Sequence, residues 1–367
     1  DCQVSLNWSF CYGCAACYNA CPENAIEKEE VNVNLVEVTI ENNKFLVPER
    51  TTVLHALEKT GFKVKAPCKT GGCYSCLVEV NGKVKRACIT PISKGARIKL
   101  LRETPVKRIV HGPQPHSVGG VGTPHWVKPR RGYVEVAIWV AGCNLRCPQC
   151  QNYHVTYDSR SKPLTPIETA EKIVATAKRY RVNRLAISGG EPTLNRKWLI
   201  EYFKCLRKLY PESRIHLDTN ATILSREYID ELVSAGMTDI GPDLKGARVE
   251  TFMKITGIKS ESLAREYLRN SWETVKYVVD KYSEVFIGVG IPYNPSFMST
   301  DELEEIADKL VSINPEIQVT VLDYRPIFKN KSIKHPSVQE MVKAREILKS
   351  RGLKTVIAQT LIGHLGP

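Results

Sequence analysis

The sequence predicts an α/β protein whose larger part is a partial (β/α)6 barrel and whose N-terminal part contains two small cysteine-rich units. Three observations lead to this expectation. Strand and helix patterns alternate from residue 134 onward, residues 31–102 have the pattern of a small mixed sheet with one helix, and most of the 13 cysteines fall in three tight arrays. Repeated βα units imply a parallel sheet with helical crossovers.

The barrel is expected from a series of strands that are each followed by a helix. The expected strands are residues 134–140, 182–188, 214–218, 238–244, 284–291, 317–323 and 354–358. The expected helices are residues 165–180, 193–209, 225–236, 262–282, 299–312 and 337–351. Roughly six such units favour an open or partial barrel over a closed eight-fold one.

Pattern and composition divide the chain into four regions. They are a short segment at 1–30, a small domain at 31–102, a linker at 103–133 and the barrel domain at 134–367. The first region is too small to stabilise itself by burial, so a bound cluster is expected to organise it. The hairpin signal Asn81-Gly82 supports a sheet in the second region, and repeated Gly and Pro mark the third as a connection.

The composition is that of an ordinary globular protein, with 43% hydrophobic and 25% charged residues. It excludes a mostly disordered chain, and no apolar run is long enough to predict a transmembrane helix. The chain does not open with a signal peptide, so we expect a cytoplasmic location and no membrane partner. The formal charge of +13 fits either an anionic partner or solubility alone. Clusters and thiolates add negative charge, which makes a nucleic-acid partner a weaker expectation.

The first cysteine array lies in the N-terminal segment. Its members are Cys11, Cys14, Cys17 and Cys21, and Pro22 follows them. This spacing resembles the ligand run of bacterial 4Fe–4S ferredoxins, and the Cys-Pro ending disfavours the alternative of a zinc site. The sequence leaves two possibilities for the fourth ligand of this cluster. Either Cys21 is the fourth ligand, or Cys2 is and Cys21 is spare or serves another cluster.

The second array lies in the small domain. Its members are Cys68, Cys73, Cys76 and Cys88. The two spacings between the first three cysteines are those of plant-type 2Fe–2S ferredoxins. The short gap to Cys88 resembles the ferredoxin domains of succinate dehydrogenase and xanthine dehydrogenase. A β-grasp 2Fe–2S ferredoxin-like domain is therefore expected, with Gly71 and Gly72 allowing backbone N–H groups to approach the cluster.

The third array follows the first strand of the barrel. Its members are Cys143, Cys147 and Cys150. Three thiolates leave one iron of a cubane cluster without a protein ligand, and chemistry at a metal needs such an open position. Polar residues end the next three strands, at the mouth where barrel enzymes place their sites. These residues are Gly189, Gly190, Glu191, Asp218, Asn220, Asp243 and Lys245.

The stretch from Gly142 to Asn152, together with these strand ends, resembles the radical S-adenosylmethionine (radical SAM) superfamily. The likeness is to the branch of pyruvate formate-lyase-activating and AmmeMemoRadiSam enzymes. It implies that the GGEP stretch holds the amino group of adenosylmethionine and that Asp218, Asp243 and Lys245 contact the same cofactor. The chain departs from that branch at Gln149, where an aromatic residue usually lies against the adenine, and at Asp323–Pro326, which lacks the usual His.

The resemblance implies an oxidoreductase or activating-type radical SAM enzyme with two 4Fe–4S clusters, one 2Fe–2S cluster and adenosylmethionine. Reductive cleavage of adenosylmethionine would yield a 5′-deoxyadenosyl radical that abstracts hydrogen from a substrate, with the protein orienting the reactants. The N-terminal clusters are expected to relay electrons from an external low-potential donor. The opposite role, in which they remove an electron from a product radical, stays open. The substrate is unknown, and the activating-enzyme likeness favours a protein or peptide. The alternatives are an electron-transfer subunit of a larger complex and an RNA-modifying radical enzyme.

Overall fold

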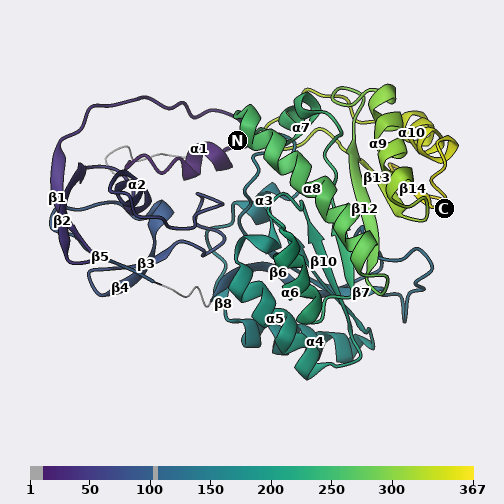
Figure 1. The fold of residues 1–367 in the computed structure, drawn as a ribbon, viewed down its shortest axis with the longest axis horizontal. Helices are drawn as coiled ribbons and strands as arrows, with labels where there is room; N and C mark the ends of the chain where they lie inside the picture. The colour runs from purple at the N-terminus through teal and green to yellow at the C-terminus, as the bar shows by residue number, and fades with distance from the viewer. Residues whose placement is uncertain (1–10, 102–105) are drawn as a thin grey trace.

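The computed structural model describes residues 11–101 and 106–367. Two sheets organise them, a small one built from the N-terminal third and a large one built from the rest. Figure 1 shows the small sheet on one side of the molecule and the large sheet, with its covering helices, on the other. The helix α1 (Ala16–Ala20) lies near the boundary between these two parts.

The small sheet has the strand order β2-β1-β5-β3-β4. Its elements are β1 (Leu35–Ile40), β2 (Asn43–Pro48), α2 (Val53–Lys59), β3 (Leu77–Val80), β4 (Lys83–Arg86), the short helix η2 (Ala87–Ile89) and β5 (Arg97–Leu100). Strands β1 and β5 are parallel neighbours, whereas the two hairpins are antiparallel. Thr52 caps α2 by accepting a hydrogen bond from His55 N at 3.1 Å. This is the β-grasp arrangement that the sequence predicts.

The large sheet has the strand order β15-β14-β13-β12-β11-β10-β9-β7-β6-β8. Its strands are β6 (Lys107–His116), β7 (Glu135–Val140), β8 (Pro163–Leu164), β9 (Arg184–Gly189), β10 (Arg214–Thr219), β11 (Asp239–Pro242), β12 (Phe286–Tyr293), β13 (Gln318–Asp323), β14 (Val356–Thr360) and β15 (Gly363–Leu365). The run from β7 through β14 is parallel, and antiparallel strands flank it on both sides. The sheet is not closed, which confirms the prediction of a partial barrel.

Helices connect the parallel strands and cover the outside of the sheet (Figure 1). They are α4 (Pro166–Tyr180), α5 (Arg196–Leu209), α6 (Arg226–Ser234), α8 (Glu261–Lys281), α9 (Thr300–Ile313) and α10 (Val338–Ser350). All six lie where the sequence predicts a helix. Two further short helices, α3 (Tyr153–Thr156) and α7 (Val249–Thr256), were not expected, and the short helix η3 (Pro192–Leu194) overlaps the start of the helix expected at 193–209. One continuous core joins the inner faces of these helices to the strands.

Part of the region expected to be a linker forms strand β6. This strand pairs antiparallel with β7, and its register shifts at Ile109/His111 and His111/Gln114. The second shift spans Gly112-Pro113, and such residues are tolerated in a strand at a bulge. The Gly and Pro pattern that predicts a connection is therefore the pattern of a bulged strand.

The rest of that region fills the end of the barrel where the parallel strands begin. Arg184 donates to the carbonyl of Gly122 at 2.7 Å, and Gln318 donates to that of Thr123 at 2.8 Å. A Cβ on Gly122 would lie 2.6 Å from the backbone of Ile240, so only glycine fits there. The segment is thus packed against the barrel rather than suspended between domains.

Within the part of the chain that the structure describes, none of the helices is both long and apolar enough to cross a membrane.

Candidate active site

A cavity of about 190 Å³ lies where the parallel strands of the barrel end. Nearly all the residues predicted for the barrel site line it. They are Cys143, Cys147, Cys150, Gly189, Gly190, Asp218, Asn220, Asp243 and Lys245. Ser188, Asn152 and Tyr324 line it too, although the sequence analysis gave them no role. The structure therefore brings strand ends that are far apart in sequence to a single mouth.

The three cysteines of this cavity sit on the loop after β7. Burial raises the pKa of Cys143 and of Cys147, and it raises that of Cys150 to about 12. Thiols in such a place stay protonated unless a cation binds them. Two groups are set to donate to Cys143 Sγ, namely Leu145 N at 3.4 Å and Asn220 Nδ2 at 3.7 Å. Hydrogen bonds of this kind tune the potential of iron–sulfur clusters.

Across residues 11–101 and 106–367, no three His, Cys, Asp or Glu side chains are grouped as the ligands of one metal ion are. A cluster takes its thiolates at several different irons, so its ligands need not converge on one point. The three half-buried thiols on one loop fit a cluster of this kind.

Glu191 lies behind the cavity rather than on its wall. Its side chain is fully buried. Oε1 accepts hydrogen bonds from Thr193 N (3.0 Å), Thr193 Oγ1 (2.5 Å) and Thr219 Oγ1 (2.8 Å), and Oε2 accepts one from Asn220 N (2.7 Å). Burial raises the pKa of Glu191, while these four hydrogen bonds oppose the shift. The carboxylate thus ties the turn after β9 to the end of β10.

Asp218 belongs to a buried network at the end of β10. Its Oδ1 lies 3.0 Å from Nε2 of His216, and Nδ1 of His216 lies 3.4 Å from Oε2 of Glu135. Burial disfavours the charged imidazole, but the carboxylates outweigh burial and the nearby Arg184, and they raise the pKa of His216 to about 9. An imidazolium therefore holds Asp218 at the cavity wall.

The end of β11 carries an ion pair. Lys245 Nζ lies 3.1 Å from Asp243 Oδ2. Burial raises the pKa of Asp243 and Lys245 opposes that shift, whereas Asp243 and the nearby Cys147 raise the pKa of Lys245 against the effect of burial. Gln149 is fully buried beside the cysteine loop, where it donates to the carbonyl of Ile255 at 3.2 Å. Gln149 is not part of the cavity wall.

The second cysteine array forms a compact buried group in the small domain. All four thiols are at most 3% exposed, and Cys76 Sγ lies 3.4 Å from Cys88 Sγ. Hydrogen bonds from Cys73 and Cys88 lower the pKa of Cys68, and the same contacts raise those of Cys73 and Cys88. Four thiolates this close cannot coexist without cations between them. The group fits a pair of ferric or ferrous ions.

The first array surrounds α1 and touches both other parts of the chain. Tyr12 donates to the carbonyl of Ile89 at 2.8 Å, beside Cys88 of the second array. Lys329, in the loop after β13, donates to the carbonyl of Tyr18 at 2.7 Å. Ala25 N donates to Cys21 Sγ at 3.4 Å. Cys2, the alternative fourth ligand, lies outside the described residues.

Comparison with known proteins matches all three arrays to families. The description "Radical SAM superfamily" matches residues 138–310, "2Fe-2S iron-sulfur cluster binding domain" matches residues 34–103 and "4Fe-4S binding domain" matches residues 4–27. The large domain belongs to the radical SAM superfamily. The chain therefore joins a radical SAM domain to two iron–sulfur domains, and the cofactors of these domains are adenosylmethionine, two 4Fe–4S clusters and one 2Fe–2S cluster.

Curated relatives of the radical SAM domain differ in what they do. GTP 3′,8-cyclase of Alkaliphilus metalliredigens is 30% identical over 189 residues, which cover 50% of this chain and 54% of the cyclase. 7-Carboxy-7-deazaguanine synthase of Hyperthermus butylicus is 27% identical over 196 residues, 50% of this chain and 80% of the synthase. A Methanocaldococcus jannaschii protein with an inferred assignment as a glycyl-radical enzyme activating enzyme is 26% identical over 177 residues, 47% of this chain and 67% of that protein.

This chain thus spans about half the length of the cyclase. A solved structure with a similar fold is that of Streptococcus suis SuiB, with a TM-score of 0.47 and 17% identity, covering 61% of this chain and 49% of SuiB. The expectation of a protein or peptide substrate gains no support from these relatives, which include proteins named for GTP and deazaguanine chemistry.

The loops that carry Cys73 and Cys143 are in backbone contact. A Cβ added to Gly72 would lie 2.5 Å from the backbone nitrogen of Gly142, and one added to Gly142 would lie 2.7 Å from that of Cys73. Arg146 joins the same two loops by donating to the carbonyl of Cys68 at 2.5 Å and to that of Cys143 at 2.8 Å. The 2Fe–2S domain and the radical SAM domain therefore meet at their cysteine loops.

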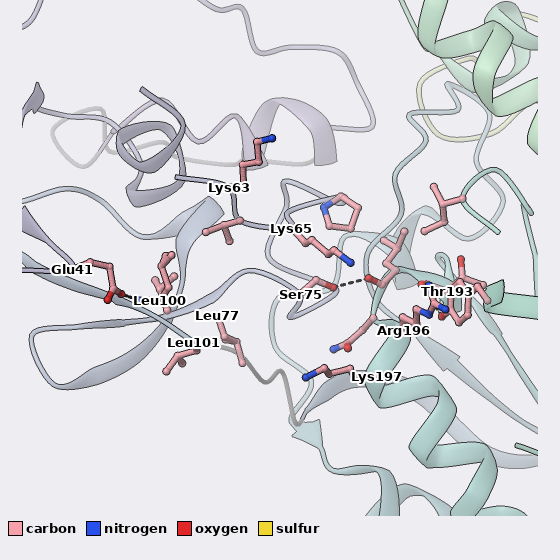
Figure 2. A pocket seen from close by; sticks show the side chains of 17 residues that line it. Glu41, Lys63, Lys65, Ser75, Leu77, Leu100, Leu101, Thr193, Arg196 and Lys197 are labelled. Carbon is pink, nitrogen blue, oxygen red and sulfur yellow. Dashed lines mark hydrogen bonds between the residues drawn. The ribbon is translucent and has the colours of Figure 1, made fainter. Parts of the chain in front are cut away.

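Two further groups hold this junction. Ser75 Oγ donates to the carbonyl of Leu194 at 2.7 Å, a bond drawn in Figure 2. Lys107, on β6, is fully buried and donates to the carbonyl of Pro192 at 3.1 Å. Burial lowers the pKa of Lys107, while nearby Cys73 and Glu191 oppose the shift. Sequence analysis missed Lys107 because it lies in the region expected to be a linker.

Proposed function

We propose that this radical SAM enzyme reduces its catalytic cluster internally, by electron transfer from the 2Fe–2S domain. In this proposal Cys143, Cys147 and Cys150 hold the catalytic 4Fe–4S cluster, and Cys68, Cys73, Cys76 and Cys88 hold the 2Fe–2S cluster. The remaining array, Cys11, Cys14, Cys17 and Cys21, holds the second 4Fe–4S cluster. The cofactor-binding residues are Gly189, Gly190, Asp218, Asn220, Asp243 and Lys245, and Glu191 positions them from behind the cavity wall.

The observation that carries the proposal is the backbone contact between Gly72 and Gly142. Each glycine directly precedes a proposed cluster ligand, Cys73 on one side and Cys143 on the other. A side chain at either position would separate the two loops. Electron transfer between clusters weakens steeply with separation, so this close packing favours direct transfer from one cluster to the other.

The bound cofactor supplies a 5′-deoxyadenosyl radical for hydrogen abstraction. The residues of the chain orient the reactants around it. The carboxylate of Glu191 fixes Asn220 N at 2.7 Å and so holds the ends of β9 and β10 together. The ion pair of Asp243 with Lys245 and the pair of Asp218 with His216 present fixed polar groups to the same cavity. Preorganised groups of this kind cost no reorganisation during reaction.

The substrate is proposed to enter through a second, adjoining cavity of about 650 Å³. It shares Ser188, Asp218 and Asp243 with the active-site cavity. Among the described residues that line it there is neither Lys nor Arg. Because phosphates are bound mainly by these side chains, we propose a polar substrate without a polyphosphate, in contrast to GTP.

Anaerobic reconstitution of the wild type and of a Cys76→Ser variant tests the internal electron transfer. Cys76 lies in the core of the 2Fe–2S domain, away from the Gly72–Gly142 contact. We expect 5′-deoxyadenosine formation driven by a reduced low-potential ferredoxin to fall by about tenfold or more, while formation driven by dithionite persists. Cys205→Ser, a partly buried thiol on α5, is the matched control. Equal ferredoxin-driven rates in the wild type and Cys76→Ser contradict the proposal.

A further inference from the structure

A second large cavity lies between the 2Fe–2S domain and the radical SAM domain, away from the active site. Its volume is about 800 Å³. Figure 2 shows Lys65 reaching it from the 2Fe–2S domain and Lys197 from the other side. Its wall combines cations with apolar groups, among them Lys63, Lys65, Leu77, Arg196, Lys197 and Ile223. Nothing in the proposed radical chemistry uses this cavity.

The charge of the cavity is positive. Lys63 and Lys65 are exposed on one side, and Arg196 and Lys197 begin helix α5 on the other. The N-terminus of a helix adds further positive potential. Among the described lining residues the sole carboxylate belongs to Glu41, and it already accepts a hydrogen bond from Leu100 N at 2.5 Å. Arg196 is ion-paired with Glu231 at 2.7 Å, so the exposed Lys63 and Lys65 supply most of the attraction.

The wall of the cavity adjoins ligands of the 2Fe–2S cluster. Pro67 directly precedes Cys68, and Ser75 and Leu77 flank Cys76. The thiols themselves are buried, with 0% exposure at Cys68 and 1% at Cys76. A reductant bound at this cavity would therefore be separated from the cluster only by the residues next to its ligands, namely Pro67, Ser75 and Leu77.

The N-terminal 4Fe–4S domain presents the opposite charge. Its described residues include four exposed glutamates and one exposed lysine, namely Glu23, Glu27, Glu29, Glu30 and Lys28. An acidic protein is repelled by such a segment and attracted by the lysine-rich cavity. Exposure of Cys11 and Cys17 alone would favour the first segment as the entry point, but charge favours the cavity.

We propose that this cavity is the docking site of a small acidic electron-carrier protein. Its surface carboxylates pair with Lys63 and Lys65, and one electron passes from the carrier to the iron pair held by Cys68, Cys73, Cys76 and Cys88. The carrier is oxidised by one electron, the iron pair is reduced by one, and no atom is transferred. This proposal rests on the internal electron transfer proposed above and adds the place where the electron enters.

Stopped-flow reduction of the reconstituted enzyme by a reduced acidic plant-type ferredoxin tests the docking site. The variant is Lys63→Glu/Lys65→Glu, and the matched control is Lys343→Glu/Lys349→Glu on α10, on the opposite side of the molecule. At low ionic strength we expect the second-order rate constant for 2Fe–2S reduction to fall by about tenfold in the variant. In the control we expect it to fall by no more than about twofold, since a distant charge is screened. Reduction by dithionite should be equal in all three proteins.

Either of two results overturns the docking site. One is an equal loss of rate in the variant and the control, which indicates a non-specific effect of net charge. The other is an unchanged rate in the variant, with the 4Fe–4S cluster reduced first, which indicates entry through the N-terminal domain. Neither result contradicts the proposed electron transfer between the clusters on the Cys73 and Cys143 loops, because Cys76→Ser tests that step separately.

Discussion

The ammonium group of Lys107 lies 3.1 Å from the carbonyl oxygen of Pro192, at the junction between the two cysteine loops. Its second acceptor is the carbonyl of Glu191 at 3.5 Å. Cys68, Cys73 and Cys143 are all close enough to influence its charge. Lys107 is thus a buried lysine between the two sites proposed to hold clusters, and a positive charge there would stabilise the reduced state of both.

Replacing this cation should lower the potentials of the adjoining clusters. For Lys107→Met we expect the 2Fe–2S potential to fall by roughly 60 mV, which corresponds to a tenfold change for a one-electron couple. An anaerobic redox titration followed by electron paramagnetic resonance measures the shift. Lys99→Met, an exposed lysine on β5, serves as the control. Unchanged potentials at full iron content would show that Lys107 is only a packing residue.

The glycine contact predicts an effect on rate rather than on potential. In Gly72→Ala the new Cβ meets the backbone of Gly142 at 2.5 Å, and a backbone cannot move aside as a flexible side chain can. The loops must separate, so ferredoxin-driven formation of 5′-deoxyadenosine should slow by about tenfold while dithionite-driven formation changes little. Gly82→Ala is the control for backbone strain alone, because Gly82 has a φ of 76° but its added Cβ meets no atom within 4 Å. Equal rates in Gly72→Ala and Gly82→Ala would falsify the role given to this contact.

Much of the fold follows from local sequence. The strands and helices of the barrel lie within a few residues of their expected places, because each strand is an apolar run and several helices begin at a side-chain cap. Thr165 and Ser337, for example, both form capping boxes with a glutamate three residues later. The spacing of the cysteines likewise predicts which loops carry thiols, since a cluster dictates close spacing along the chain.

The contacts between domains could not be predicted in this way. Strand β6 carries Gly112-Pro113, which locally favours a loop, yet pairing with β7 outweighs that preference and places Lys107 in the interior. The approach of Gly72 to Gly142 joins residues that are 70 positions apart, and no periodic pattern encodes such a contact. The resemblance implies that the GGEP stretch holds the amino group of adenosylmethionine. The carboxylate of Glu191 instead accepts hydrogen bonds from Thr219 and Asn220 at the end of β10.

The buried carboxylate of Glu191 predicts a loss of both stability and cofactor binding on substitution. In Glu191→Gln an amide nitrogen replaces one of the two carboxylate oxygens. The new NH2 group must then face a backbone N–H that formerly donated to that oxygen, either Thr193 N or Asn220 N. We expect a cost of about 2 to 4 kcal/mol in the free energy of unfolding. Anaerobic thermal unfolding and equilibrium binding of adenosylmethionine measure the two effects. Glu201→Gln, on the exposed face of α5, should change neither.

The absence of Lys and Arg from the described lining of the adjoining cavity predicts that GTP is not the substrate. Adding GTP with Mg²⁺ to the reduced enzyme should change the rate of 5′-deoxyadenosine formation by less than about twofold, since the described lining of the cavity proposed for the substrate offers its phosphates no Lys or Arg. Liquid chromatography of the reaction mixture detects both 5′-deoxyadenosine and any product of GTP. A GTP-dependent burst with a new guanine-derived product contradicts the proposed substrate class.

The pair of His216 and Asp218 predicts a dependence of stability on pH. Carboxylates raise the pKa of His216 to about 9, against burial and Arg184, whereas an unfolded histidine titrates near 6.5. A raised pKa in the folded state stabilises the fold fully below the unfolded value, and this stabilisation is lost as the pH rises through about 9. The wild type should therefore exceed His216→Gln in stability by roughly 3 kcal/mol near pH 6, and the difference should shrink toward pH 9.5. Thermal unfolding of both proteins under anaerobic conditions at several pH values measures this. A difference that stays constant from pH 6 to 9.5 indicates that His216 is neutral in the fold and that its contribution is packing alone.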